Sequence, residues 1–424
     1  MALPVYKRIS DKKHIAMLAY LCGLVYFTSY VTRINYKAVT SAVMETDNLP
    51  MTLASLPSTG LFITYGVGQL ISGVLGDRIR PKYLMCAGLL LASVTNVLMP
   101  LSADTVFRVT VWCINGFGQA LMWPPIVKIM TGYLSANDYL HAILKTSWGS
   151  QAGTFVVYLG APLILALTSS WHNVFYISAL IGLLGALLVI FGLGYIERYA
   201  EKYGAENPND ESGEKPGAPG TAIFPKGFAF IFGMLVFSNV LQGSLRDGVD
   251  AWMPTYVKQA FGLSDSSSIL TAVILPVFGL ATYQLAAFIA EHVIHNDALG
   301  AAFFFALCGT SSLALAFVSG AEFAGSLAFT VLFFALISGS MHGANIILTS
   351  FIVRRFKKFG NVSTISGVLN FGTYVGAAIS IYAFAALRES IGWTGTIFSW
   401  VIIAAVGLAV CLVIARPFWR IVKD

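Results

Sequence analysis

Two arginines stand inside stretches of sequence that are otherwise strongly apolar. The first is Arg33 in YFTSYVTRINY, and the second is Arg246 in NVLQGSLRDGVDAWMPTY. They are 213 residues apart (246 − 33), which is almost half of the 424-residue chain. A guanidinium group offers a planar fork of donors that fits a phosphate or a carboxylate through two parallel hydrogen bonds. The pair therefore predicts an anion-binding site to which each half of the chain contributes one arginine.

Other polar and aromatic residues occur near the first arginine at helical spacing. Tyr26 and Tyr30 precede Arg33 by seven and three residues, so the three side chains share one helix face. We expect that face to line the anion-binding site. Further candidate lining residues come from other apolar segments: Tyr65, Gln69, Gln151, His342 and Asn345.

Each of these candidates also has a purely structural explanation. Arg33 could extend to the outer membrane interface together with Lys37, one turn further on. Arg246 could form an ion pair with Asp247 or with Asp250, which lies four residues on and on the same helix face. Tyrosines are common packing residues in membrane spans, and a single histidine is more often packed than part of a proton relay. Asp247 and Asp250 are therefore candidates either for ion pairing or for coupling to an ion.

The elements that must position these residues are membrane-spanning helices. The chain is 57% hydrophobic and 11% charged, with a mean hydropathy of +0.75, whereas soluble domains carry about 25% charged residues. A helix needs about 20 apolar residues to cross a bilayer. The sequence predicts an all-α integral membrane fold of twelve transmembrane helices in two six-helix halves. The predicted spans are 14–36, 56–76, 82–101, 106–131, 142–168, 172–196, 226–258, 266–290, 297–318, 325–352, 361–387 and 391–415.

Charge and polarity predict how these spans are connected. Lys and Arg gather in the segments on one side of the predicted spans, and the positive-inside rule assigns that side, with both termini, to the cytoplasm. The polar stretch from Glu201 to Gly220 carries proline, glycine and charge without apolar periodicity, which predicts a linker. The predicted organisation is a first half at 1–196, a linker at 197–225 and a second half at 226–424. Such a repeat favours a binding site near the middle of the membrane between the halves.

Two short motifs predict local features. Asp77, Arg78 and Lys82 lie in GVLGDRIRPK, which closes the second predicted span. Their charges can cap helix ends and pair across the bundle, so we expect a gating contact there. In the fourth predicted span, WPP at 123–125 predicts a kink, because proline removes a helix hydrogen bond.

Several function classes are disfavoured by motifs that the sequence lacks. It contains no GxxxxGK[ST], no HExxH and no Ser/His/Asp set in a polar domain, so we expect neither an enzyme nor an ATP-driven pump, and no cofactor. The five cysteines show no metal-binding spacing, and we expect no metal site. The basic residues lie between apolar spans and not in a soluble basic domain, so no nucleic-acid partner is expected.

The motifs together resemble the major facilitator superfamily, and within it the organophosphate:phosphate antiporter family of glycerol-3-phosphate and hexose-phosphate transporters. The resemblance covers essentially the whole chain. It rests on Tyr26, Tyr30, Arg33 and Asn35, on GQALMWPP at 118–125, on LRDG at 245–248 followed by WMPTY at 252–256, and on the loop motif formed by Gly73, Asp77, Arg78 and Lys82.

The resemblance implies a specific activity. It implies the exchange of a small phosphorylated metabolite for inorganic phosphate by alternating access, with Arg33 and Arg246 holding the phosphate. It also implies a multi-pass protein of the cytoplasmic membrane, surrounded by lipid, and we expect a monomer.

Departures from the family pattern leave two alternatives open. A lysine that the family carries in the second span is Gln69 here, and a histidine of the fifth span is replaced around Gln151 and Ala152. One alternative is a proton- or sodium-coupled transporter of an organic carboxylate such as a sugar acid, with Asp247 and His342 as coupling residues. The other is a membrane ligand sensor of the same fold.

Overall fold

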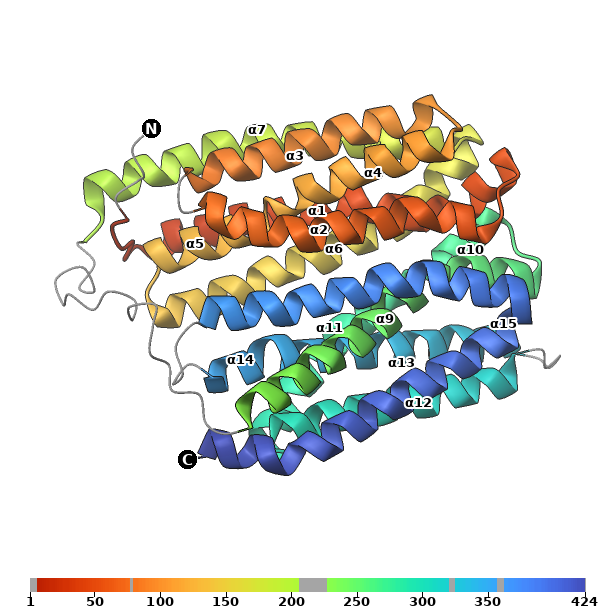
Figure 1. The fold of residues 1–424 in the computed structure, drawn as a ribbon. Coiled ribbons are helices and arrows are strands. Elements are labelled where there is room, and N and C mark those ends of the chain that lie inside the picture. The colour runs from red at the N-terminus through yellow and green to blue at the C-terminus, as the bar shows by residue number, and fades with distance from the viewer. Residues whose placement is uncertain (1–5, 77–78, 206–226, 320–324, 357–361, 424) are drawn as a thin grey trace. The chain divides into compact units, whose positions relative to one another are not determined.

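The computed structural model describes residues 6–76, 79–205, 227–319, 325–356 and 362–423 (Figure 1). Regular structure in these residues is helical, apart from a short backbone pairing between Arg8 and Ala205. The predicted all-α fold is therefore confirmed.

The chain divides into two compact units. Unit 1 comprises residues 1–36 and 63–218, and unit 2 comprises residues 37–62 and 219–424. The first two helices contribute to both units, because α1 leaves unit 1 after Tyr36 and α2 enters it at Ile63.

Unit 1 contains most of the first seven helices. They are α1 (Lys12–Asp47), α2 (Met51–Gly76), α3 (Pro81–Leu98), α4 (Thr105–Ala120), α5 (Trp123–Tyr133), α6 (Ala136–Thr168) and α7 (His172–Tyr203), with a 3₁₀ turn at Met99–Leu101. α3 and α7 lie side by side along their length (Figure 1). The apolar core of this unit draws on several helices, with Leu18, Leu89, Ile129, Ala142 and Leu193 all buried.

Unit 2 contains the remaining helices. They are α9 (Phe228–Phe261), α10 (Asp265–Thr271), α11 (Ile274–His292), α12 (Asp297–Val318), α13 (Ser326–Ile346), a π-helical turn (Ile347–Phe351), α14 (Ile352–Arg355) and α15 (Val362–Lys423). Gly392 has φ 74° and ψ 179°, a conformation that favours glycine, and it divides α15 into two helical arms. The first arm packs along α9 (Figure 1).

Short polar residues fix where several helices begin. Ser135 accepts a hydrogen bond from the backbone N–H of Asp138, and Asn296 accepts from Ala298 and Leu299. Asp11 accepts from the backbone N–H of His14 at the start of α1. These side chains satisfy N–H groups that have no partner within the helix. The hydrogen bond from the His14 ring also lowers the pKa of the Asp11 carboxyl.

The predicted kink in the fourth span is present as a complete break. α4 ends at Ala120 and α5 begins at Trp123, so Pro124 and Pro125 occupy the first turn of α5. Proline is tolerated there because those positions donate no intrahelical hydrogen bond. The Leu121 N–H instead donates to the Gly118 carbonyl at 3.2 Å.

Other predicted boundaries are corrected. α7 continues to Tyr203, beyond residue 196 where the sixth predicted span ended, because a helix can run on past its apolar stretch. Residues 206–225 of the predicted linker, and Asp77 and Arg78 of the predicted gate, lie outside the described residues, and the division into two halves stays a prediction.

Nine helical segments of the described part are long and apolar enough to cross a membrane. One of them, Ile365–Val422, contains both arms of α15. The count of twelve spans stays a prediction.

Glycines set the closest helix crossings in both units. A Cβ atom on Gly149 of α6 would meet the backbone of Gly23 in α1 at less than 3.0 Å. In unit 2, a Cβ atom on Gly376 of α15 would meet the Val240 carbonyl of α9 equally closely. Each glycine belongs to a GxxxG pattern, Gly149-x-x-x-Gly153 or Gly372-x-x-x-Gly376, the spacing that lets two helix backbones approach in membranes.

We expect Gly149→Ala and Gly376→Ala to destabilise the protein by about 1–3 kcal/mol each, because the added methyl group strikes backbone that must move. Thermal unfolding of the purified protein in detergent measures the effect. Gly160→Ala in α6 and Gly367→Ala in α15 are matched controls, since a Cβ atom there meets nothing within 4 Å. Equal unfolding temperatures for all four variants would contradict the close crossings.

Candidate functional site

Arg33 is buried in unit 1 against two tyrosines. Its side chain is 6% exposed on α1, and its guanidinium carbon lies 4.1 Å from the ring centre of Tyr30 and 5.2 Å from that of Tyr65. Both distances fall in the range of cation–π attraction. The tyrosine faces stabilise the cation without neutralising it, so its charge can still attract an anion.

Aromatic contacts continue from Arg33 towards the break between α4 and α5. The rings of Tyr26 and Tyr30 are 5.4 Å apart, and Tyr26 lies 4.8 Å from Trp123 at the start of α5. The structure thus brings Tyr26, Tyr30, Tyr65 and Arg33 together, which agrees with the helix-face prediction. The break before Trp123 is what places its ring at the end of this row.

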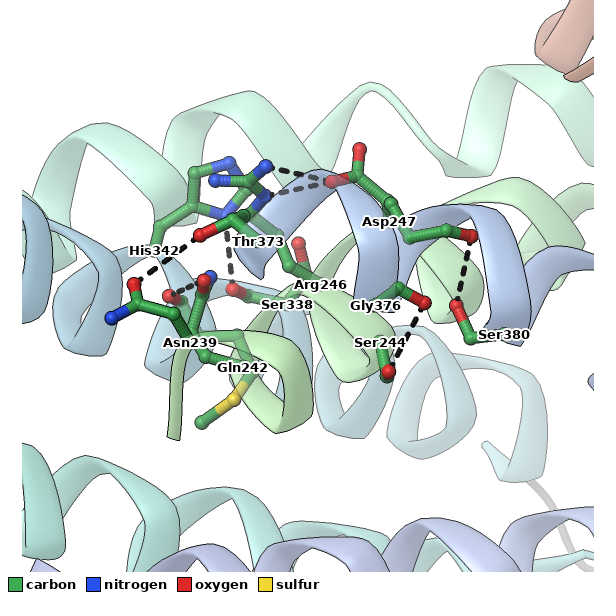
Figure 2. A network of polar contacts seen from close by, with 12 residues as sticks. Asn239, Gln242, Ser244, Arg246, Asp247, Ser338, His342, Thr373, Gly376 and Ser380 are labelled. Atoms are coloured by element: carbon green, nitrogen blue, oxygen red, sulfur yellow. Dashed lines mark hydrogen bonds and ion pairs between the residues drawn. The ribbon is translucent and has the colours of Figure 1, made fainter. Parts of the chain in front are cut away.

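Arg246 lies in unit 2 on α9 and is held by the residue that follows it. Its Nε and Nη2 atoms donate to Oδ2 of Asp247 at 3.1 and 2.7 Å (Figure 2). The other oxygen, Oδ1, accepts from Lys37 Nζ at 3.1 Å. Lys37 is 5% exposed, and its Nζ also lies 4.9 Å from the ring centre of Phe62.

Lys37, Arg246 and Asp247 form what we call the basic triad. Two cations share one carboxylate, so the triad itself carries a formal excess of positive charge. Buried charges in a low-dielectric interior attract opposite charge much more strongly than charges in water. The triad can therefore attract a second anion, which would compete with Asp247 for the guanidinium group of Arg246.

His342 and Asn345 lie on α13 of the same unit. His342 Nδ1 is 3.0 Å from the Ser338 carbonyl, and its ring meets that of Tyr283 edge-on at 5.8 Å. A carbonyl only accepts, so Nδ1 donates the hydrogen of this contact. Figure 2 shows His342 close to Arg246, within range of its charge. Asn345 is partly buried one turn further on.

The remaining predicted residues take different positions. Gln151 is 5% exposed on α6, Gln69 is partly buried one turn beyond Tyr65, and Asp250 is partly buried one turn beyond Arg246. Their roles at the site remain predictions. Lys82 Nζ forms an ion pair with Glu197 of α7 within unit 1, so it joins the start of α3 to the end of α7.

One structural alternative from the sequence is disfavoured. Arg33 and Lys37 are both almost fully buried within the protein, whereas a side chain that extends to the membrane interface would be exposed. The ion pair expected for Arg246 is present and involves Asp247. Lys37 is a partner that the sequence analysis did not assign, because 210 residues separate it from Asp247.

A second feature was also missed. Ser29, Thr32, Asn35, Thr95, Asn96, Asn115 and Gln119 form a hydrogen-bonded polar cluster in unit 1, and each is at most 2% exposed. The sequence did carry a signal, since Asn115 and Gln119 are polar amides four residues apart within an apolar span.

Helices of this length and apolarity in the described residues indicate a polytopic helical membrane protein. The model of the Major Facilitator Superfamily matches residues 22–381, and the chain belongs to that family. The resemblance described from the motifs is thereby confirmed.

Relatives are consistent with that assignment. The chain is 23% identical to a probable hexose phosphate transport protein of Chlamydia muridarum over 94% of this chain and 88% of the relative. It is 26% identical to the glycerol-3-phosphate transporter of Bacillus subtilis, over 62% of this chain and less than two thirds, 61%, of the relative. It is 26% identical to the membrane sensor protein UhpC of Salmonella typhimurium, over 44% and 39%. The matched transporters support the expectation that the chain is not an enzyme.

Solved structures share the fold. A bacterial homolog of the human lysosomal transporter Spinster, in an inward-facing and unoccupied conformation, superposes with a TM-score of 0.76 at 14% identity. That match covers 97% of this chain and 99% of the other. At this identity the likeness concerns the fold alone.

We expect Asp247→Asn to destabilise the protein strongly, by about 3–5 kcal/mol, because it leaves Lys37 and Arg246 buried without their carboxylate. Thermal unfolding in detergent measures the loss. The double variant Lys37→Met with Asp247→Asn also removes one of the two cations that Asp247 pairs with, and it should recover part of the lost stability.

Asp265→Asn is the matched control. Lys258 Nζ lies 2.9 Å from Asp265 but also 2.6 Å from Glu45, so it keeps a partner, and we expect less than about 1 kcal/mol of loss. If Asp247→Asn unfolded at the wild-type temperature, the basic triad would not contribute to stability.

Proposed function

We propose that the protein is a secondary transporter that exchanges a small phosphorylated metabolite, of the sugar-phosphate or glycerol-phosphate type, for inorganic phosphate by alternating access. The observation that carries the proposal is the placement of a buried Arg33 and a partly buried Arg246 in two apolar units of a chain related to organophosphate transporters. A charged side chain within a membrane-spanning segment is costly, and it is therefore a candidate for a functional site.

The surroundings of Arg33 suit a phosphoryl group. Tyr30 and Tyr65 contact the guanidinium group by their ring faces, and an oxyanion would bind to the donors in the guanidinium plane. Phosphate oxygens bound by N–H donors in a buried site gain more from each hydrogen bond than they would in water. In this proposal Tyr26 and Tyr30 line the substrate site next to Arg33.

Arg246 would bind a phosphoryl group through an exchange of partners. A substrate oxyanion would replace Asp247 on Nε and Nη2 of Arg246. Asp247 would then remain paired with Lys37, whose Nζ already contacts Oδ1. Asp247 therefore keeps a cation as its partner when the substrate binds, which lowers the free-energy cost of releasing Arg246.

The rest of the predicted site is proposed in the same terms. His342, Asn345, Gln69 and Gln151 would contact the organic part of the substrate, which the low identity to the relatives leaves undefined. We propose a cytoplasmic membrane location with both termini in the cytoplasm, following the distribution of Lys and Arg along the chain.

A ligand sensor is the second candidate function. It is favoured by the match to the membrane sensor protein UhpC. A sensor would bind the phosphorylated ligand through the same arginines but would carry no flux, so measurements of binding and of exchange separate the two functions.

We expect proteoliposomes loaded with inorganic phosphate to take up labelled phosphate, and empty vesicles not to do so. Arg33→Ala and Arg246→Ala should each reduce uptake at subsaturating phosphate by about 10–100-fold, since each removes hydrogen bonds to a charged group worth about 1.5–3 kcal/mol. Phosphate uptake by Arg33→Lys should fall nearly as far, because the point charge of lysine does not reproduce the planar fork of arginine.

Arg108→Lys is a matched control for this experiment. Arg108 is also buried in unit 1, its Nε donates to the Ser102 carbonyl at 2.8 Å, and its guanidinium group lies 5.2 Å from the ring centre of Trp171. We expect its replacement to leave the KM for phosphate unchanged.

Binding without exchange would support the sensor. Uptake driven by a pH or sodium gradient without internal phosphate would support the carboxylate symporter.

A further inference from the structure

The buried polar cluster in unit 1 is centred on the residue that precedes Arg33. The Thr32 carbonyl oxygen accepts from Asn96 Nδ2 at 2.8 Å and from Asn115 Nδ2 at 3.2 Å. The Thr32 hydroxyl accepts from Gln119 Nε2 at 3.0 Å. Three donors from α3 and α4 thus converge on a single residue of α1.

Two further contacts hold α1 on either side of this point. Ser29 Oγ donates to Gln119 Oε1 at 2.5 Å, one turn before Arg33. Asn35 Nδ2 donates to Asn96 Oδ1 at 2.5 Å, shortly after it. The donors are themselves connected, because Gln119 Nε2 also contacts Asn115 Oδ1 at 3.1 Å.

Such a cluster fixes the rotation of α1 about its axis, which apolar packing alone does not fix. Apolar contacts are non-directional, whereas hydrogen bonds to a carbonyl and a hydroxyl of one residue set the rotation of the helix about its axis. Tyr30 lies on α1 and turns with Arg33, whereas Tyr65 lies on α2, so a rotation of α1 about its axis would carry the Arg33 guanidinium group away from the Tyr65 ring.

The cluster also lies at a particular place along α1. The helix belongs to unit 1 up to Tyr36 and to unit 2 from Lys37 onward. The hydrogen bonds therefore hold the last turn of α1 that packs in unit 1, and Arg33 is in that turn.

We propose that Thr32, Asn96, Asn115 and Gln119 are positioning residues for anion binding, which hold Arg33 in the orientation that presents its fork to the substrate. This inference rests on the proposed binding of phosphate by Arg33. None of the four residues needs to touch the substrate, since they act through the backbone and hydroxyl of Thr32.

A pair of variants at Thr32 tests the proposal. Thr32→Val keeps the shape and removes the hydroxyl that Gln119 contacts, and Thr32→Ser keeps the hydroxyl. We expect Thr32→Val to raise the KM for inorganic phosphate in the exchange assay about tenfold, or about 1.4 kcal/mol. The rate at saturating phosphate should stay within about twofold, and Thr32→Ser should restore the wild-type KM.

Thr146→Val is the matched control. Thr146 is also fully buried in unit 1, and its hydroxyl donates to the Ala142 carbonyl of its own helix at 3.0 Å. Thr146→Val makes the same side-chain change as Thr32→Val, so the two variants share any general effect on folding. We expect the KM of Thr146→Val for inorganic phosphate to equal that of the wild type.

A double variant separates positioning from a merely structural role. In Arg33→Lys the fork is already absent, so adding Thr32→Val should raise the KM little further. Full additivity, a wild-type KM for Thr32→Val, or equal KM changes in Thr32→Val and Thr146→Val would each overturn the proposal.

A failure of the proposed function can be distinguished from a failure of the positioning proposal. If the wild-type protein showed no phosphate exchange, the proposed function would fall. The orientation of Arg33 would then be measured by its rate of modification by phenylglyoxal, quantified by mass spectrometry of the purified protein. A changed rate in Thr32→Val relative to Thr146→Val supports positioning, and an unchanged rate refutes it.

Discussion

The structure depends on the cost of placing guanidinium groups in an apolar, membrane-spanning bundle. Charged side chains at such depth persist only when the fold compensates for lost hydration. The two units do so in different ways, because Arg33 lies on tyrosine faces and Arg246 pairs with a carboxylate that Lys37 also holds. Aromatic rings carry no negative charge that could neutralise a cation. In an ion pair, the carboxylate competes with any other anion for the cation.

Much of the surrounding architecture supports these two arrangements. The break before Trp123 lets its ring contact Tyr26, at the end of the aromatic row that begins at Arg33. The close approach of α6 to α1 at Gly149 and Gly153 leaves Tyr30 against the α6 backbone. Buried amides of α3 and α4 then hold the same turn of α1. Helix packing, proline placement and hydrogen bonding thus act on one short segment.

Local sequence patterns predicted the features that depend on local chemistry. Apolar length predicted the helices, WPP predicted the break, and helical spacing placed Tyr26 and Tyr30 beside Arg33. Features that depend on distant residues were not predictable in this way. No pattern near Lys37 indicates Asp247. Tyr65 was predicted to line the same site as Arg33, but its spacing did not indicate a contact between its ring and the guanidinium group. Helix ends also shifted, as at Tyr203, because polar residues can extend a helix beyond its apolar stretch.

The glycine crossings have a consequence for how the sequence can change over evolutionary time. A side chain at Gly343 would collide with the ring of Phe304, and a smaller neighbour could accommodate it. A side chain at Gly149, Gly243 or Gly376 would instead collide with the backbone of the opposite helix, which every residue type carries. No compensating substitution exists for these positions. We expect these glycines not to vary, so no second position would vary together with them. Methods that infer contacts from correlated substitutions would therefore miss the places where the helices approach most closely.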